Sequence, residues 1–219
     1  DSSVGMSRCA GMVLLVTVRI TVPQVSCWYS HCMRGDVDIS GRTADLRDAL
    51  IDIVLAEGFA DLQMSDLATR LSCSKSTLYA IAPSKEQLIV VAVRTFFRRA
   101  TERVEAAVDP SAPAKDRIHA YLTAVASELA PASPRFFADL ERFAPAGDIY
   151  RQNTEIAARR VQELVVEAEP GTDARFLGTV ARLVMESIHR GDVSRATGLD
   201  DSAAYRSLAG LILAGLSGP

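Results

Sequence analysis

Several side chains that can bind phosphate or base edges lie close together in the chain. Lys75 carries a cation, Ser76 and Thr77 carry hydroxyl groups, and Tyr79 carries a phenol. They follow Ser74, whose hydroxyl can cap a helix by accepting a hydrogen bond from a free backbone N–H group. The start of a helix also carries a partial positive charge that suits phosphate. These residue types therefore predict contacts to phosphate oxygens and to base edges in a major groove.

The histidines and cysteines form no catalytic or metal-binding pattern. His31, His119 and His189 are far apart in the sequence, and none has a carboxylate or cysteine partner at a recognisable spacing. Cys27 and Cys32 flank His31, but the spacing matches no standard zinc pattern and no fourth ligand lies nearby. We therefore expect a protein that is not an enzyme and that binds no metal and no cofactor.

Two short helices joined by a tight turn are expected to position the side chains of residues 75–79. Leu67, Ala68 and Leu71 share one face of the first helix, and Ser65 is its expected N-cap. Leu78 is the inward residue of the second helix. Two short helices that cross at a small residue are typical of a helix-turn-helix.

Longer helices are predicted on both sides of this motif. Before it, Leu46, Leu50 and Val54 repeat at helical spacing, and Gly58 is a suitable C-terminal stop. After it, Ser84 and Gln87 have the spacing of a capping box, which predicts a connecting helix over residues 85–107.

A run of these residues resembles the DNA-binding signature of a known family. Ala68, residues 74–79 (Ser-Lys-Ser-Thr-Leu-Tyr) and residues 83–88 (Pro-Ser-Lys-Glu-Gln-Leu) together resemble the signature of TetR-family transcriptional regulators. The match covers about residues 42–95. The resemblance implies a cytoplasmic, ligand-responsive DNA-binding regulator, most often a repressor, that binds a pseudo-palindromic operator as a homodimer.

The chain departs from the family pattern around the turn. Ser72 stands where the family usually has Gly, and a non-Gly residue at positive φ costs about 1 kcal/mol. Ile81 and Ala82 stand where the family usually has aromatic residues, so packing there should be looser unless neighbours fill the space.

Charge gives no general sign of nucleic-acid binding. The net charge is −3, and the helix-turn-helix region is near neutral, so DNA binding must depend on where the charges lie. We assign to the DNA contact Arg42, Ser65, Ser74, Lys75, Ser76, Thr77, Tyr79 and Lys85.

The remainder of the chain is predicted to be helical. Apolar periodicity favours helices over residues 114–130, 135–143, 148–168, 172–189 and 201–216, with a loop from 192 to 200. The predicted fold class is all-α, with an N-terminal three-helix helix-turn-helix domain followed by a larger C-terminal helical bundle. The expected divisions are a disordered extension (1–39), the DNA-binding domain (40–84), the connecting helix (85–107) and an effector-binding and dimerisation domain (108–219).

An aromatic cluster is a candidate effector pocket. Tyr121, Phe137, Phe143 and Tyr150 lie where TetR-like regulators hold a small molecule, although aromatic residues build cores at least as often. Asp139, on the same predicted helix as Phe137, is expected to face solvent.

The last helix is a candidate dimer interface. It is apolar on nearly all sides, so it must be buried either in the protein's own core or against a two-fold partner. The resemblance favours the partner, through Val180, Val184, Leu208, Leu211 and Ile212.

The expected partners are double-stranded DNA, a second copy of the chain and a small-molecule effector. No membrane partner is expected, because the apolar stretch 12–22 is too short to span a bilayer and Arg19 interrupts it. The first residues do not resemble the rest, and we expect the natural chain to begin at Met33. A helical enzyme or an interaction module with a degenerate helix-turn-helix remains the alternative.

Overall fold

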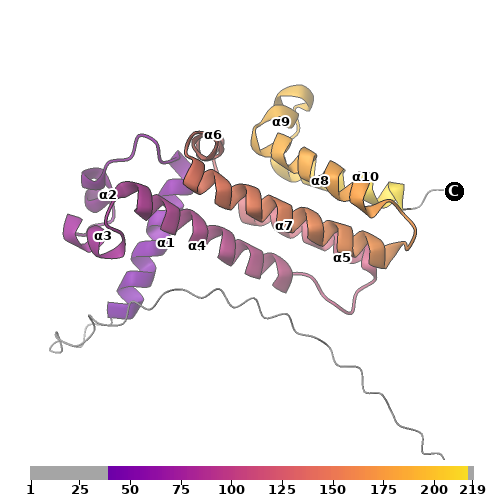
Figure 1. The fold of residues 1–219 in the computed structure, drawn as a ribbon, viewed down its shortest axis with the longest axis horizontal. Helices are drawn as coiled ribbons and strands as arrows, with labels where there is room; N and C mark the ends of the chain where they lie inside the picture. Colours follow the sequence, from indigo (N-terminus) through magenta and orange to yellow (C-terminus); the bar gives the residue numbers. More distant parts are fainter. Residues whose placement is uncertain (1–38, 217–219) are drawn as a thin grey trace, which may run out of the picture. The chain divides into compact units, whose positions relative to one another are not determined.

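The computed structural model describes the backbone of residues 39–216 and the side chains of residues 44–216. Predictions on residues 1–38, including the start at Met33, and on the side chain of Arg42 lie outside this range. The described elements are all α-helices (Figure 1). They are α1 (Ile39–Glu57), α2 (Met64–Arg70), α3 (Lys75–Ile81), α4 (Lys85–Ala106), α5 (Ala114–Leu129), α6 (Pro134–Arg142), α7 (Ala144–Ala168), α8 (Ala174–His189), α9 (Asp192–Thr197) and α10 (Asp201–Gly215).

The N-terminal helices share one hydrophobic core with α6. Leu50, Leu67, Leu78 and Leu88 bring α1, α2, α3 and the first part of α4 together around this core. Phe136 of α6 is buried in the same cluster, although it lies far along the chain. Figure 1 shows α6 beside the C-terminal end of α1, where Ser133 N–H donates to the Leu55 carbonyl at 2.8 Å. A segment of the second half of the chain therefore completes the core of the first.

The remaining helices enclose a second hydrophobic core. Leu122 of α5, Leu164 of α7, Met185 of α8 and Leu208 of α10 are among its buried members. The end of α4 joins them through Val104. This arrangement is the larger C-terminal bundle that the periodicity predicted.

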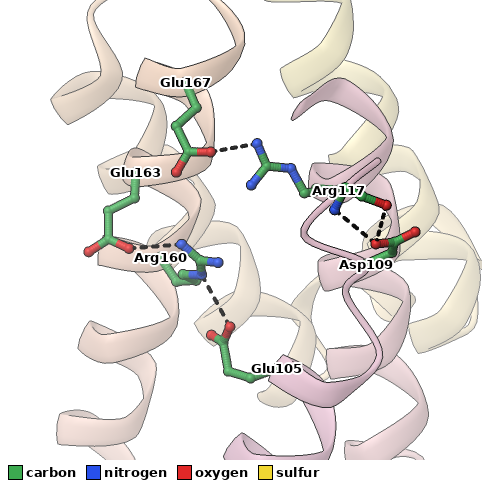
Figure 2. A network of polar contacts seen from close by, with 7 residues as sticks. Glu105, Asp109, Arg117, Arg160, Glu163 and Glu167 are labelled. Atoms are coloured by element: carbon green, nitrogen blue, oxygen red, sulfur yellow. Dashed lines mark hydrogen bonds and ion pairs between the residues drawn. The ribbon is translucent and has the colours of Figure 1, made fainter. Parts of the chain in front are cut away.

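Ion pairs tie α4, α5 and α7 together along the bundle (Figure 2). Arg160 of α7 reaches Glu105 of α4 at 3.3 Å and Glu163 of its own helix at 3.1 Å. Arg117 of α5 pairs with Glu167 of α7 at 2.5 Å. These contacts link helices rather than form a reactive centre.

Two sequence predictions about helix limits are wrong. The gap between the helices predicted over residues 135–143 and 148–168 is absent, because α7 begins at Ala144 and includes Pro145 and Gly147. Proline is tolerated there because the first turn of a helix has no internal partner for its N–H groups. The predicted loop after His189 contains α9, a single short helix between two left-handed glycines, Gly191 and Gly198.

Candidate functional site

The turn between α2 and α3 is centred on a serine in the left-handed region. Ser72 has a φ of 49°, so the conformation predicted for this position is confirmed. Its N–H donates to the Thr69 carbonyl at 3.1 Å, and the Cys73 N–H donates to the Ala68 carbonyl at 2.9 Å. These bonds close α2 and allow α3 to begin two residues later. The two helices therefore form the predicted helix-turn-helix.

α3 is anchored by one buried side chain and presents its polar residues outward. Leu78 is fully buried. Ser74 caps the helix as predicted, because the Thr77 N–H donates to its Oγ at 3.1 Å. The same Oγ lies 2.6 Å from Ser76 Oγ and 2.9 Å from Thr77 Oγ1. With Tyr79 half-exposed, the helix shows a row of hydroxyl groups to solvent.

Lys75 supplies the positive charge at the start of this row. Its side chain is exposed, as is that of Arg47 on α1, and neither makes an ion pair with any residue in the described range. Other cations nearby are already paired: Arg70 with Glu57, and Arg99 of α4 with a carboxylate of α1. The charge available for phosphate near α3 therefore comes from few side chains.

The predicted capping role of Ser65 is wrong. α2 begins at Met64, and its N-cap is Gln63, which makes no side-chain capping bond. Ser65 is the second residue of the helix, and its carbonyl accepts from Thr69 Oγ1 at 3.0 Å. Its side chain is exposed, so its assignment to the DNA contact stays a prediction.

The turn between α1 and α2 is held by side chains from two other helices. Lys85, the first residue of α4, donates from Nζ to the Ala60 carbonyl at 2.7 Å. Asp139 of α6 accepts from the N–H groups of Phe59 and Ala60 at 2.6 and 2.9 Å. Two of the three donors of Lys85 remain for phosphate, and that contact stays a prediction.

The expectation that Asp139 faces solvent is wrong, because its side chain is buried against this turn. Gly58 has a φ of +76°, and a Cβ added there would lie 2.5 Å from Asp139 Oδ2. The Asp139 carboxylate can therefore approach the backbone closely, because Gly58 has no side chain. Periodicity could not identify Asp139, since its partners are backbone N–H groups about eighty residues earlier.

The aromatic residues assigned to the effector pocket do not all lie at one site. Phe137 and Tyr150 line a pocket of about 180 Å³ between α6, α7 and α8. Tyr121 lies instead in the bundle, beside a much smaller pocket of about 30 Å³. Phe143 packs edge-on against Phe59, with ring centroids 6.0 Å apart, so it belongs to the N-terminal core. The prediction of one shared pocket is wrong for Tyr121 and Phe143.

A buried histidine that the sequence did not identify completes the pocket wall. His189 stacks on Phe137, with ring centroids 4.7 Å apart and planes 6° from parallel. Its Nδ1 lies 2.6 Å from Tyr150 Oη, and its Nε2 lies 2.7 Å from Tyr205 Oη. Burial, followed by the nearby charge of Arg190, lowers the pKa of His189 to about 3, so the ring is neutral. Its two tyrosine partners are distant in sequence, which is why no local spacing indicated the group.

The residues assigned to the dimer interface differ in the exposure of their side chains. Leu208 and Ile212 are buried in the chain's own bundle core, so their side chains cannot meet a partner. Leu211 is 61% exposed. Val180 and Val184 are half-buried on α8. Two large apolar side chains that sequence reasoning did not assign are also exposed on α8, Phe176 and Leu183.

The described residues contain neither a metal-binding cluster nor a helix that could span a membrane. No group of three histidines, cysteines or carboxylates in residues 44–216 could hold a metal ion. Over the same part of the chain, no helix combines the length and apolar character needed to cross a bilayer.

Comparison with solved structures identifies the fold. A TetR-family transcriptional regulator from Streptomyces coelicolor is 19% identical, with a TM-score of 0.65, and the match covers 82% of this chain and 97% of that one. A transcriptional regulator from Saccharomonospora viridis, solved with choline, is 15% identical, with a TM-score of 0.65, over 79% of this chain and 95% of that one. FadR from Bacillus subtilis, solved with stearoyl-CoA, is 16% identical, with a TM-score of 0.57, over 79% and 98%.

The chain therefore has the fold of TetR-like transcriptional regulators, as its motif suggested. No protein-family model matches the sequence, and no curated protein matches it.

Proposed function

We propose that this protein is a TetR-like transcriptional repressor that binds a pseudo-palindromic DNA operator as a homodimer and releases it on binding a small molecule. It is a regulator and not an enzyme, and it works in the cytoplasm. The observation that carries the proposal is α3, a capped helix with one buried anchor and outward-facing Lys75, Ser76, Thr77 and Tyr79. Such a helix can place its N-terminal side chains in a major groove.

Dimerisation follows from the small size of one reading unit. A single helix-turn-helix buries too little surface for strong specific binding, so two units about 34 Å apart are needed. The exposed side chains of Phe176, Leu183 and Leu211 on α8 and α10 support a partner on this face. Val180 and Val184, which are half-buried on α8, could contribute at its edge.

Release of DNA can be transmitted by α6. Phe137 and Leu140 on this helix line the pocket, while Asp139 between them holds the turn that precedes α2. A ligand that shifts α6 would therefore shift the support of the helix-turn-helix. Solved structures of the same fold contain choline and stearoyl-CoA, which supports a small-molecule role for the bundle.

The test is binding to duplex DNA from the promoter of the protein's own gene, followed by fluorescence anisotropy. Wild type should bind specifically, and Lys75→Ala should bind about tenfold more weakly because one phosphate or guanine contact is lost. The control is Arg206→Ala, which removes the same charge from an exposed site on α10.

Equal affinities of Lys75→Ala, Arg206→Ala and wild type for the operator would show that Lys75 of α3 does not contact the DNA. Absence of specific binding by the wild type to this promoter and to selected random sequences would favour an interaction module with a degenerate helix-turn-helix.

A further inference from the structure

The buried chain of Tyr205, His189 and Tyr150 has only one fully satisfied arrangement of protons. Tyr205 is 1% exposed, and the partner of its hydroxyl is His189 Nε2, at 2.7 Å. A buried hydroxyl that only accepted a bond would leave its own proton without a partner, which is costly. The Tyr205 hydroxyl therefore donates to Nε2.

The direction of the next bond follows from the chemistry of neutral imidazole. A neutral ring has one N–H and one acceptor nitrogen, so when Nε2 accepts, the proton is on Nδ1. The low pKa of His189, caused first by burial, keeps the ring in this neutral form. Nδ1–H then donates to Tyr150 Oη, 2.6 Å away. Tyr150 uses its oxygen as an acceptor, and its own O–H proton remains to be donated elsewhere.

One group in the protein competes for that proton. Thr154 donates its own hydroxyl proton to the Tyr150 carbonyl at 3.0 Å, so its oxygen keeps lone pairs that the Tyr150 hydroxyl can use. Tyr150 lines the pocket between α6, α7 and α8, beside Phe137 and His189. A molecule in the pocket that carries an acceptor atom could receive the Tyr150 proton in place of Thr154.

The charged groups around the pocket are largely compensated by their own partners. Arg190 pairs with Asp192 at 2.9 Å, and the same carboxylate pairs with Arg195 at 2.5 Å. Glu186 pairs with Arg182 at 2.7 Å. Arg151 pairs with its neighbour Asp148. Glu141, also in the wall, makes no ion pair with any residue that the structure describes. The charged residues of the wall, Glu141, Arg151, Glu186 and Arg190, sum to zero, so an anionic ligand would meet no net positive charge.

We propose that this pocket binds an uncharged molecule that has an aromatic or apolar body and a hydrogen-bond acceptor such as a carbonyl, with Tyr150 as the donor. The body packs beside Phe137, and the acceptor takes the Tyr150 proton. The assignment rests on the proposed function for its regulatory meaning, but binding itself requires no DNA.

The first test measures proton position directly in the wild-type protein. Nitrogen NMR of ¹⁵N-histidine-labelled protein should show His189 neutral at pH 7, protonated on Nδ1 and bare on Nε2. A proton on Nε2 would overturn the proposal, because Tyr150 would then donate to His189 and have none to offer.

The second test uses two probes of similar shape, acetophenone and ethylbenzene, of which only the first has a carbonyl. Binding is followed by ligand-observed NMR without DNA. Tyr150→Phe should weaken acetophenone about tenfold, the value of one hydrogen bond, and leave ethylbenzene within about twofold. Benzoate, which is anionic, should bind wild type more weakly than acetophenone.

Three outcomes would overturn the assignment: acetophenone unaffected by Tyr150→Phe, no binding of either probe, or benzoate bound more tightly than acetophenone. Each can occur while wild type still binds its operator, so the ligand assignment can fail alone. If wild type binds the probes as expected but binds no operator, the proposed function is wrong and the ligand assignment stands.

Discussion

α3 and α6 are both short helices that begin with a capping serine, yet they are used in opposite ways. α3 buries one residue, Leu78, and leaves its polar side chains in solvent. α6 buries four, Phe136, Phe137, Asp139 and Leu140. The difference shows that a single buried anchor can hold a short helix and leave its polar face in solvent, as the proposed contact with DNA requires. It becomes a structural connector when its polar group is buried and bonded to the backbone of a distant turn.

The largest effect is expected from removing the buried carboxylate of α6. Asp139→Ala leaves the N–H groups of Phe59 and Ala60 without their partner, which should cost about 3 kcal/mol of unfolding free energy. Urea denaturation measures it. The control is Asp61→Ala, which breaks an exposed ion pair with Arg135 and should cost at most about 0.5 kcal/mol. Similar losses for the two variants would show that α6 is not the connector described here.

A smaller effect should follow from filling the space that Asp139 occupies. Gly58→Ala puts a Cβ against Oδ2 in a left-handed backbone and should cost about 2 kcal/mol. Gly198→Ala is the matched control: its φ is +75°, nothing lies within 4 Å of the added atom, and backbone strain alone should cost about 1 kcal/mol. In the double variant Gly58→Ala, Asp139→Ala, the two losses should not add fully, because the shortest contact, the one with Oδ2, is gone. Strict additivity would argue against contact between the two residues.

The smallest predicted effect comes from removing the capping serines of α6 and α3. Ser133→Ala removes the bond from the Phe136 N–H and should lower global stability by about 1 kcal/mol, because α6 unfolds only with the core. Ser74→Ala removes the equivalent bond in α3, where it should appear as local opening with amide exchange about fivefold faster. Hydrogen exchange of each helix, measured beside urea denaturation, distinguishes the two. Equal global losses with no local change in α3 would contradict the contrast.

The local features of α3, its preceding turn and the start of α4 could be predicted from the sequence. Ser74 and Ser84 cap their helices, and Ser72 takes positive φ, because these outcomes depend on residues within one turn of each other. The helical periodicity also gave the all-α architecture, since an apolar stripe must be buried wherever it packs.

The contacts that join distant segments could not be predicted. Asp139 reads as a solvent-facing residue because its backbone partners lie far away in the chain. His189 gave no signal because Tyr150 and Tyr205 come from two other helices. Tyr121 and Phe143 looked like neighbours of Phe137 by sequence distance, but Tyr121 packs in the bundle core. Phe143 shares a core with Phe137, yet it packs against Phe59 and does not line the pocket. Side-chain direction, set by packing, decides such cases.

The place of α6 in the N-terminal core has a consequence for building hybrid regulators. A graft that exchanges only the contiguous helices before the bundle would leave behind Phe136, which packs edge-on against Phe59 and Phe96. The recipient's own sixth helix would then have to fit an aromatic surface that it did not evolve beside, and would have to supply a carboxylate for the turn at Ala60. The transferable unit is discontinuous: the helices from α1 to Ala100 of α4, together with α6. Swapping operator specificity between such proteins is therefore a matter of exchanging two separate pieces of chain at once.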